Sequence, residues 1–203
     1  MADPVLTYQR RRRALVEAGA YDPSSEHDAC GVGLVAAIDG RPRRDIVDMA
    51  ISALKAVWHR GAVAADGKTG DGAGLLVAIP QGFFRAQVER MGRAPLAPDL
   101  CAGMIFQPRT NLSAQDSCRS IVEAEIIRDG FNVYGWRQAP VDPSRLGLRA
   151  GLVRPEIEQI LFCDLRGRKT DELERALYLI RRRIEKRARE AGHQEFYVSS
   201  LSA

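Results

Sequence analysis

DACGVGLVAAI, residues 28–38, is the stretch at which the chain changes character. Residues 1–29 are polar and lack sustained apolar alternation, so we predict that they form a mobile leader, or propeptide, with a short helix at residues 8–18. The apolar run that starts at Cys30 is followed by the turn signal Asp39-Gly40, and this pattern predicts a buried strand. The chain therefore divides into a leader, residues 1–29, and a folded part, residues 30–203.

The composition is that of a soluble globular protein. Of the 203 residues, 45% are apolar and 28% are charged, and the length suits one domain or part of a larger one. The net charge of +4 comes from 30 basic and 26 acidic side chains that are interspersed, which argues against a nucleic-acid partner. There is no apolar run of membrane-spanning length and no apolar core of a secretory signal. We therefore expect a cytoplasmic protein without a membrane anchor.

The four cysteines predict free thiols in a reducing compartment. They are Cys30, Cys101, Cys118 and Cys163, and none forms a C-x-x-C pair. Such spacing indicates neither a zinc site nor a redox motif, so no metal site is predicted.

Hydrophobic periodicity predicts a mixed helix and strand fold. Helices are expected at residues 43–58, 113–129 and 170–191, and strands at residues 31–38, 75–79, 103–107, 131–136, 159–164 and 195–203. Four glycines within residues 65–74 predict a loop, and Ser113 is the expected N-cap of the second helix. The last run reads as a strand without a following cap, so we expect the chain to be a fragment of a longer protein.

Cys30 is the candidate nucleophile. Cleavage between Ala29 and Cys30 would place a free α-amine and a thiol on one residue. An α-amine can take the proton of a thiol near neutral pH, so this nucleophile would need no histidine. Gly31 and Gly33 would let a substrate approach the backbone closely. From the residue alone, a buried structural cysteine remains the alternative.

Several further motifs accompany this cysteine in order. They are Trp58-His59-Arg60-Gly61-Ala62, Thr69-Gly70-Asp71-Gly72-Ala73-Gly74-Leu75-Leu76, Cys118-Arg119-Ser120-Ile121-Val122-Glu123, and Gly135-Trp136-Arg137 followed by Pro140-Val141-Asp142. Together with Asp28-Ala29-Cys30-Gly31-Val32-Gly33 they resemble the N-terminal region of glutamate synthase large subunits, which are class II glutamine amidotransferases. The resemblance covers residues 26–203.

The resemblance implies an α+β fold of the N-terminal-nucleophile hydrolase type, a four-layer αββα sandwich that would be incomplete in this chain. It implies hydrolysis of L-glutamine to glutamate and ammonia through a thioester on Cys30. In the full-length enzyme of this family, ammonia converts 2-oxoglutarate to glutamate with FMN and an iron–sulfur cluster. Reducing equivalents come from a small (beta) subunit or from ferredoxin. No cofactor is expected within residues 1–203.

The resemblance also assigns site residues. Arg60 and Gly61 match the pair that such enzymes place beside the nucleophile, with a surface or core-bridging arginine as the alternative for Arg60. Asp71 and Gly72 are expected to shape the same pocket, unless they only perform turn chemistry. Gly31 adjoins the nucleophile. The family pattern places the arginine that clamps the substrate carboxylate, and the Asn-Gly pair of the oxyanion hole, after residue 203.

Two other functions also fit the sequence. One is a different amidase with an N-terminal nucleophile, although the motifs at residues 58–62 and 69–74 favour glutamine chemistry. The other is a catalytically incomplete interaction module that keeps the fold without a working site.

Overall fold

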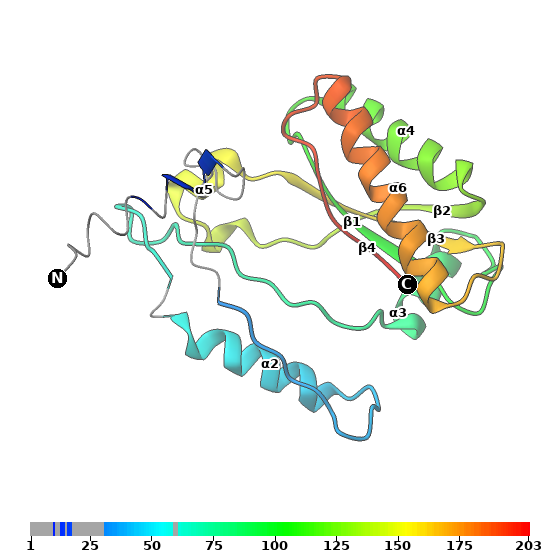
Figure 1. Ribbon diagram of the computed structural model, residues 1–203, viewed down its shortest axis with the longest axis horizontal. Coiled ribbons are helices and arrows are strands. Elements are labelled where there is room, and N and C mark those ends of the chain that lie inside the picture. Colours follow the sequence, from blue (N-terminus) through cyan, green and yellow to red (C-terminus); the bar gives the residue numbers. More distant parts are fainter. Residues whose placement is uncertain (1–9, 11–12, 15, 18–30, 59–60) are drawn as a thin grey trace.

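The fold is built around one antiparallel sheet. The computed structural model describes residues 10, 13–14, 16–17, 31–58 and 61–203, and the five described residues before residue 18 are helical. The main elements are α2 (Arg44–Ala56), α3 (Gln81–Arg90), β1 (Cys101–Gln107), α4 (Leu112–Arg128), β2 (Phe131–Gln138), the 3-10 turn η2 (Pro143–Arg145), α5 (Leu148–Val153), β3 (Glu156–Asp164), α6 (Thr170–Glu190) and β4 (Tyr197–Ser202). The strand order is β2-β3-β1-β4, and every neighbouring pair is antiparallel. Figure 1 shows α4 and α6 side by side over the sheet.

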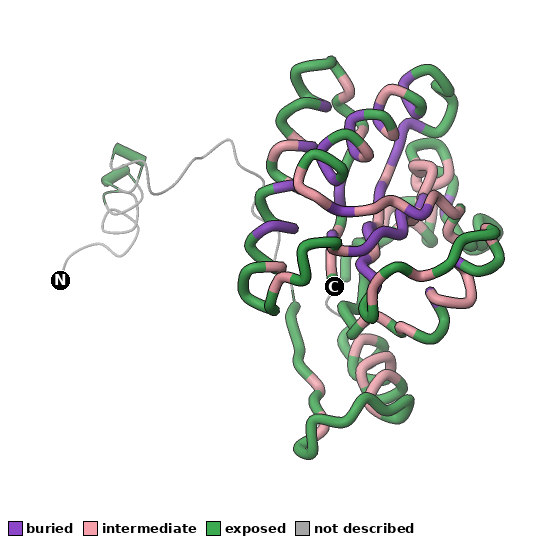
Figure 2. The backbone as a smooth tube through the Cα atoms, turned by 90° about the vertical axis from the view of Figure 1, so that its right-hand side faces the viewer, coloured by how far each residue is buried: buried purple, intermediate pink, exposed green. Residues whose placement is uncertain are grey.

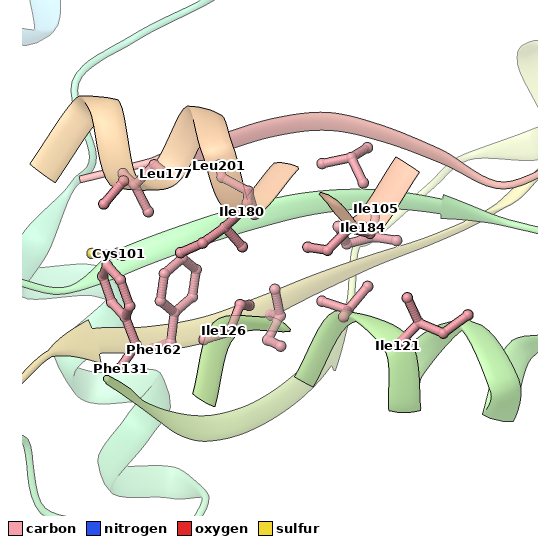
Figure 3. Close-up of a cluster of buried hydrophobic side chains, with 14 residues drawn as sticks. Cys101, Ile105, Ile121, Ile126, Phe131, Phe162, Leu177, Ile180, Ile184 and Leu201 are labelled. Carbon is pink, nitrogen blue, oxygen red and sulfur yellow. The ribbon is translucent and has the colours of Figure 1, made fainter. Parts of the chain in front are cut away.

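The main core lies between the sheet and the pair α4 and α6. Leu177, Ile180 and Ile184 form the stripe by which α6 faces the strands, and all three are buried. Figure 3 shows them in one cluster with Ile121 and Ile126 of α4, which lies on the same face of the sheet. The predicted helix at residues 170–191 is confirmed, and its buried side chains lie on one face because residues spaced three and four apart share a helix face.

A smaller core covers the opposite face of the sheet. Phe84 and Val88 of α3 pack there against Tyr134, Leu161 and Cys163. Side chains of β3 alternate between the two cores, and residues 160–163 are all buried. Both faces of β3 are therefore packed against a core. In the described part of the chain, no helix is both long and apolar enough to cross a membrane.

The predicted strands at residues 31–38 and 75–79 are wrong. The structure forms neither, and Val32, Leu34 and Leu76 are 95%, 91% and 89% exposed. No residue described between 31 and 83 is buried, and Figure 2 shows this part as exposed and intermediate backbone beside the buried sheet. A strand needs a neighbour for its backbone hydrogen bonds and a surface for its apolar side chains. The apolar pattern is present in both segments, but nothing in the described chain covers them.

The helix predictions need smaller corrections. The N-cap of α4 is Asn111, whose side chain accepts a hydrogen bond from the Ala114 amide at 3.0 Å, and Ser113 lies within the first turn. Both residue types suit a cap, so the pattern alone did not choose between them. Two helices, α3 and the six-residue α5, were not predicted from the sequence. Only Phe84 and Val88 of α3 are buried, which leaves little periodic signal.

An ion network joins the two helices that cover the sheet. Glu125 of α4 is 1% exposed and accepts hydrogen bonds from Arg187 at 2.7 Å and from Arg183 at 2.9 Å. Arg183 also contacts Asp129, which pairs with Arg168 at 2.8 Å. Burial opposes ionisation of Glu125, but the two arginine hydrogen bonds outweigh it and hold the pKa of this carboxyl below its ordinary value.

Replacing Glu125 with glutamine is expected to lower the free energy of unfolding by about 1–3 kcal/mol at neutral pH, because charge-assisted hydrogen bonds are lost. A lowered folded-state pKa adds stability above the unfolded-state value of 4.5, and this stability is lost as pH falls through the folded-state value. The variant should therefore lose less stability on acidification than the parent. Denaturant unfolding at pH values from neutral to about 3 measures both effects.

Glu190→Gln is the matched control, since it breaks only an exposed pair with Lys186 at 3.7 Å. It should change stability by less than about 1 kcal/mol. Equal losses in the two variants would show that the Glu125 network contributes no more than a surface pair.

Candidate functional site

The candidate nucleophile Cys30 and the candidate arginine Arg60 lie outside the described residues. Gly31, which follows the nucleophile, is exposed, and a Cβ placed on it would have no neighbour within 4 Å. Among the described residues, no backbone hydrogen bond links Gly31 to Gly61 or Asp71. The proximity of Cys30 and Arg60 therefore stays a prediction.

Gly61 and Asp71 do come together, at the base of a short β-hairpin formed by residues 61–71. The Ala62 amide donates to Asp71 Oδ2 at 2.7 Å, and the Asp71 amide donates to the Ala62 carbonyl at 3.3 Å. Val63 and Gly70 form the β-bridge above this pair. Asp71 thus fixes the backbone directly after Gly61, while its neighbour Gly72 is exposed. The predicted loop at residues 65–74 is in part this hairpin.

Asp66 organises the turn of the hairpin. Its carboxylate accepts hydrogen bonds from the Thr69 hydroxyl at 2.5 Å, the Thr69 amide at 2.7 Å and the Lys68 amide at 3.1 Å. The Thr69 hydroxyl is the largest of the causes that hold the pKa of the Asp66 carboxyl far below its ordinary value. Gly67 has φ +68°, a left-handed conformation that favours glycine. The carboxylate is therefore ionised and fully engaged at neutral pH.

The same two side chains connect the hairpin to α5. Asp66 Oδ2 accepts from the Arg149 amide, and Thr69 Oγ1 accepts from the Ala150 amide, both at 3.3 Å. Gly147, the N-cap of α5, is buried against this contact. Neither Asp66 nor Gly147 was predicted as a site residue from the sequence. The order Asp66-Gly67-x-Thr69 is typical of a side-chain-capped turn and was a local signal for the turn alone.

The three described cysteines are unsuited to nucleophilic or metal chemistry. Cys101, Cys118 and Cys163 are all buried in the cores. Burial raises the pKa of Cys101 to about 12 and that of Cys118 to about 11, so both thiols stay protonated. Within the described residues, no group of three or more His, Cys, Asp or Glu side chains is placed to hold a metal ion.

The sequence model for "Glutamine amidotransferases class-II" matches residues 30–203, so the match begins at Cys30. The glutamate synthase [NADPH] large chain of Azospirillum brasilense is 52% identical over 201 residues, which is 98% of this chain and 13% of the relative. The ferredoxin-dependent glutamate synthase 2 of Synechocystis sp. is 41% identical over 180 residues, 87% of this chain and 11% of the relative.

A ferredoxin-dependent glutamate synthase of Arabidopsis thaliana, chloroplastic/mitochondrial, is 36% identical over 89% of this chain and 11% of its own length. The chain thus spans about an eighth or less of the length of these curated relatives. The antiparallel sheet with its helices confirms the α+β class, and the family has the N-terminal-nucleophile hydrolase fold. The family match covers residues 30–203, and from it we conclude that the chain belongs to the class II glutamine amidotransferases.

Proposed function

We propose that this chain is the glutaminase module of a glutamate synthase, with Cys30 as its nucleophile. The observation that carries the proposal is the class II amidotransferase match that starts at Cys30, together with relatives that are all named glutamate synthases. The described cysteines support the assignment by contrast. They are buried and protonated, which leaves Cys30 as the remaining candidate among the four.

The proposed reaction is hydrolysis of a side-chain amide. The free α-amine of Cys30 takes the thiol proton, and the thiolate attacks the amide carbon of L-glutamine. The C–N bond breaks, ammonia leaves with a proton from the α-ammonium, and a glutamyl thioester remains. Water, deprotonated by the same amine, then releases glutamate and the thiol. A single residue supplies both nucleophile and base, and the hydrolysis changes no oxidation state, so it needs no oxidant or reductant.

The other predicted residues shape the site around this nucleophile. Gly31 leaves the backbone next to Cys30 open to the substrate. Arg60 and Gly61 would stand beside it, and Asp71 would hold their backbone through the Ala62 amide. Gly72 continues the same loop. The hydrogen bonds of Asp71 support a role in building the pocket rather than in the chemistry.

In the complete protein, we propose that ammonia is used on 2-oxoglutarate. The names of the relatives support either NADPH, through a small (beta) subunit, or ferredoxin as the electron source. In this proposal, FMN and the iron–sulfur cluster of such an enzyme are held by parts of the complete protein outside residues 1–203. A cytoplasmic location is part of the proposal.

Processing of the leader is the first testable consequence. The mature full-length protein is expected to begin at Cys30, because only a free α-amine at that residue can serve as the base. Intact-mass and N-terminal peptide analysis of the active enzyme measures this. An active glutamine-hydrolysing enzyme that retains residues 1–29 would contradict the mechanism, and a variant with Ala29→Pro at the cleavage site is expected to be unprocessed and inactive with glutamine.

A further inference from the structure

A cluster of hydrogen bonds joins the hairpin at residues 61–71 to α5. Asp66 accepts four hydrogen bonds, three within the turn and one from the Arg149 amide. Thr69 Oγ1 donates to Asp66 and accepts from the Ala150 amide. These bonds join segments about 80 residues apart in the chain, and neither α3 nor the sheet takes part in them.

Gly147 shows how closely the two segments approach. A Cβ at this position would lie less than 3.0 Å from Thr69 Oγ1, Thr69 N and Asp66 Oδ2. Its φ of −69° and ψ of 163° are open to any residue, so glycine is required here for space and not for conformation. The hairpin therefore sits against α5 at a separation that only glycine permits.

We infer that Asp66, Thr69 and Gly147 are positioning residues that hold the hairpin, and with it Gly61, in place for glutamine binding. The inference rests on the proposed function. The hydrogen bonds between Asp71 and Ala62 close the base of the hairpin directly beside Gly61. The side chains of Asp66 and Thr69 bind its turn to the backbone amides of α5. No residue described between 31 and 83 is buried, and the hydrogen bonds to the Arg149 and Ala150 amides anchor this hairpin to α5. Figure 1 shows α5 beside this part of the chain.

Two pairs of variants in the full-length enzyme test the inference. Gly147→Ala forces the hairpin away from α5, while Gly151→Ala in the same helix has no neighbour within 4 Å and is the control. Thr69→Val keeps the shape but removes the hydroxyl, and Thr69→Ser retains it. A loop displacement of about 1 Å is enough to cost on the order of 10²-fold in rate, so we expect at least a tenfold loss of glutamine-dependent kcat/KM in Gly147→Ala and in Thr69→Val.

The measurements are glutamine-dependent and ammonia-dependent glutamate formation, each with kcat and KM. The expected result is a raised KM for glutamine, unchanged ammonia-dependent activity, and rates within about twofold of the parent for Gly151→Ala and Thr69→Ser. Equal loss in Thr69→Val and Thr69→Ser, or loss of both activities together in Gly147→Ala, would overturn the positioning role. Cys30→Ser is run beside them. If it keeps glutamine-dependent activity, the proposed function fails, whereas full activity of Gly147→Ala with an inactive Cys30→Ser would overturn this inference alone.

Discussion

Replacing Cys30 with serine in the full-length enzyme is expected to abolish glutamine-dependent glutamate formation. A hydroxyl is far less ionised than a thiol near neutral pH, so the α-amine has much less nucleophile to generate. We expect a loss on the order of 10³-fold or more, as is found when a nucleophile is removed from a site whose residues act as a unit. Ammonia-dependent activity should be retained, because that substrate bypasses the amide hydrolysis.

Both activities measured on the same preparation make the test internally controlled. Retained ammonia-dependent turnover shows that the variant is folded and correctly assembled. Intact-mass analysis must also show that the leader has been removed, because a retained leader would itself block the α-amine. Unchanged use of glutamine by a processed Cys30→Ser variant would count decisively against Cys30 as the nucleophile.

Residues 30–203 alone are expected to hydrolyse glutamine at least about 10²-fold more slowly than the full-length enzyme. Removing one donor from an oxyanion hole costs about 10²–10³ in rate, and the resemblance places those donors after residue 203. The structure adds a second reason. Val32, Leu34 and Ile38, in the segment that follows the nucleophile, are 95%, 91% and 108% exposed, so no described residue covers these apolar side chains.

Glutamate release from glutamine by purified residues 30–203 measures this, with the full-length enzyme assayed alongside. The same exposed apolar side chains should make the segment associate, which light scattering over a concentration series detects. Turnover within tenfold of the full-length enzyme would show that the remaining segments are dispensable for binding and for oxyanion stabilisation. Circular dichroism of the same sample confirms that helices are present.

The sequence predicted those elements that carry a long and regular apolar period. The helix at residues 170–191 corresponds to α6, because Leu177, Ile180 and Ile184 recur at helical spacing and are buried. The strands predicted at residues 131–136 and 159–164 are confirmed and lie within β2 and β3. Short elements such as α5 were not predicted, since six residues are too few to show a helical period of apolar side chains.

The position of Cys30 after a polar leader, and the ordered motifs that follow, were enough to place the chain in its family and to nominate a nucleophile. The tertiary structure decided which apolar runs become strands. Residues 101–107 pair with β3 on one side and β4 on the other and have buried side chains, while residues 31–38 pair with no described strand and bury no side chain. It also decided what Asp66 and Gly147 do, because hydrogen bonds and close packing between residues about 80 positions apart leave no periodic trace in a sequence. The secondary structure of a segment is favoured by its own side chains, whereas its long-range contacts depend on which other segments the fold brings close to it.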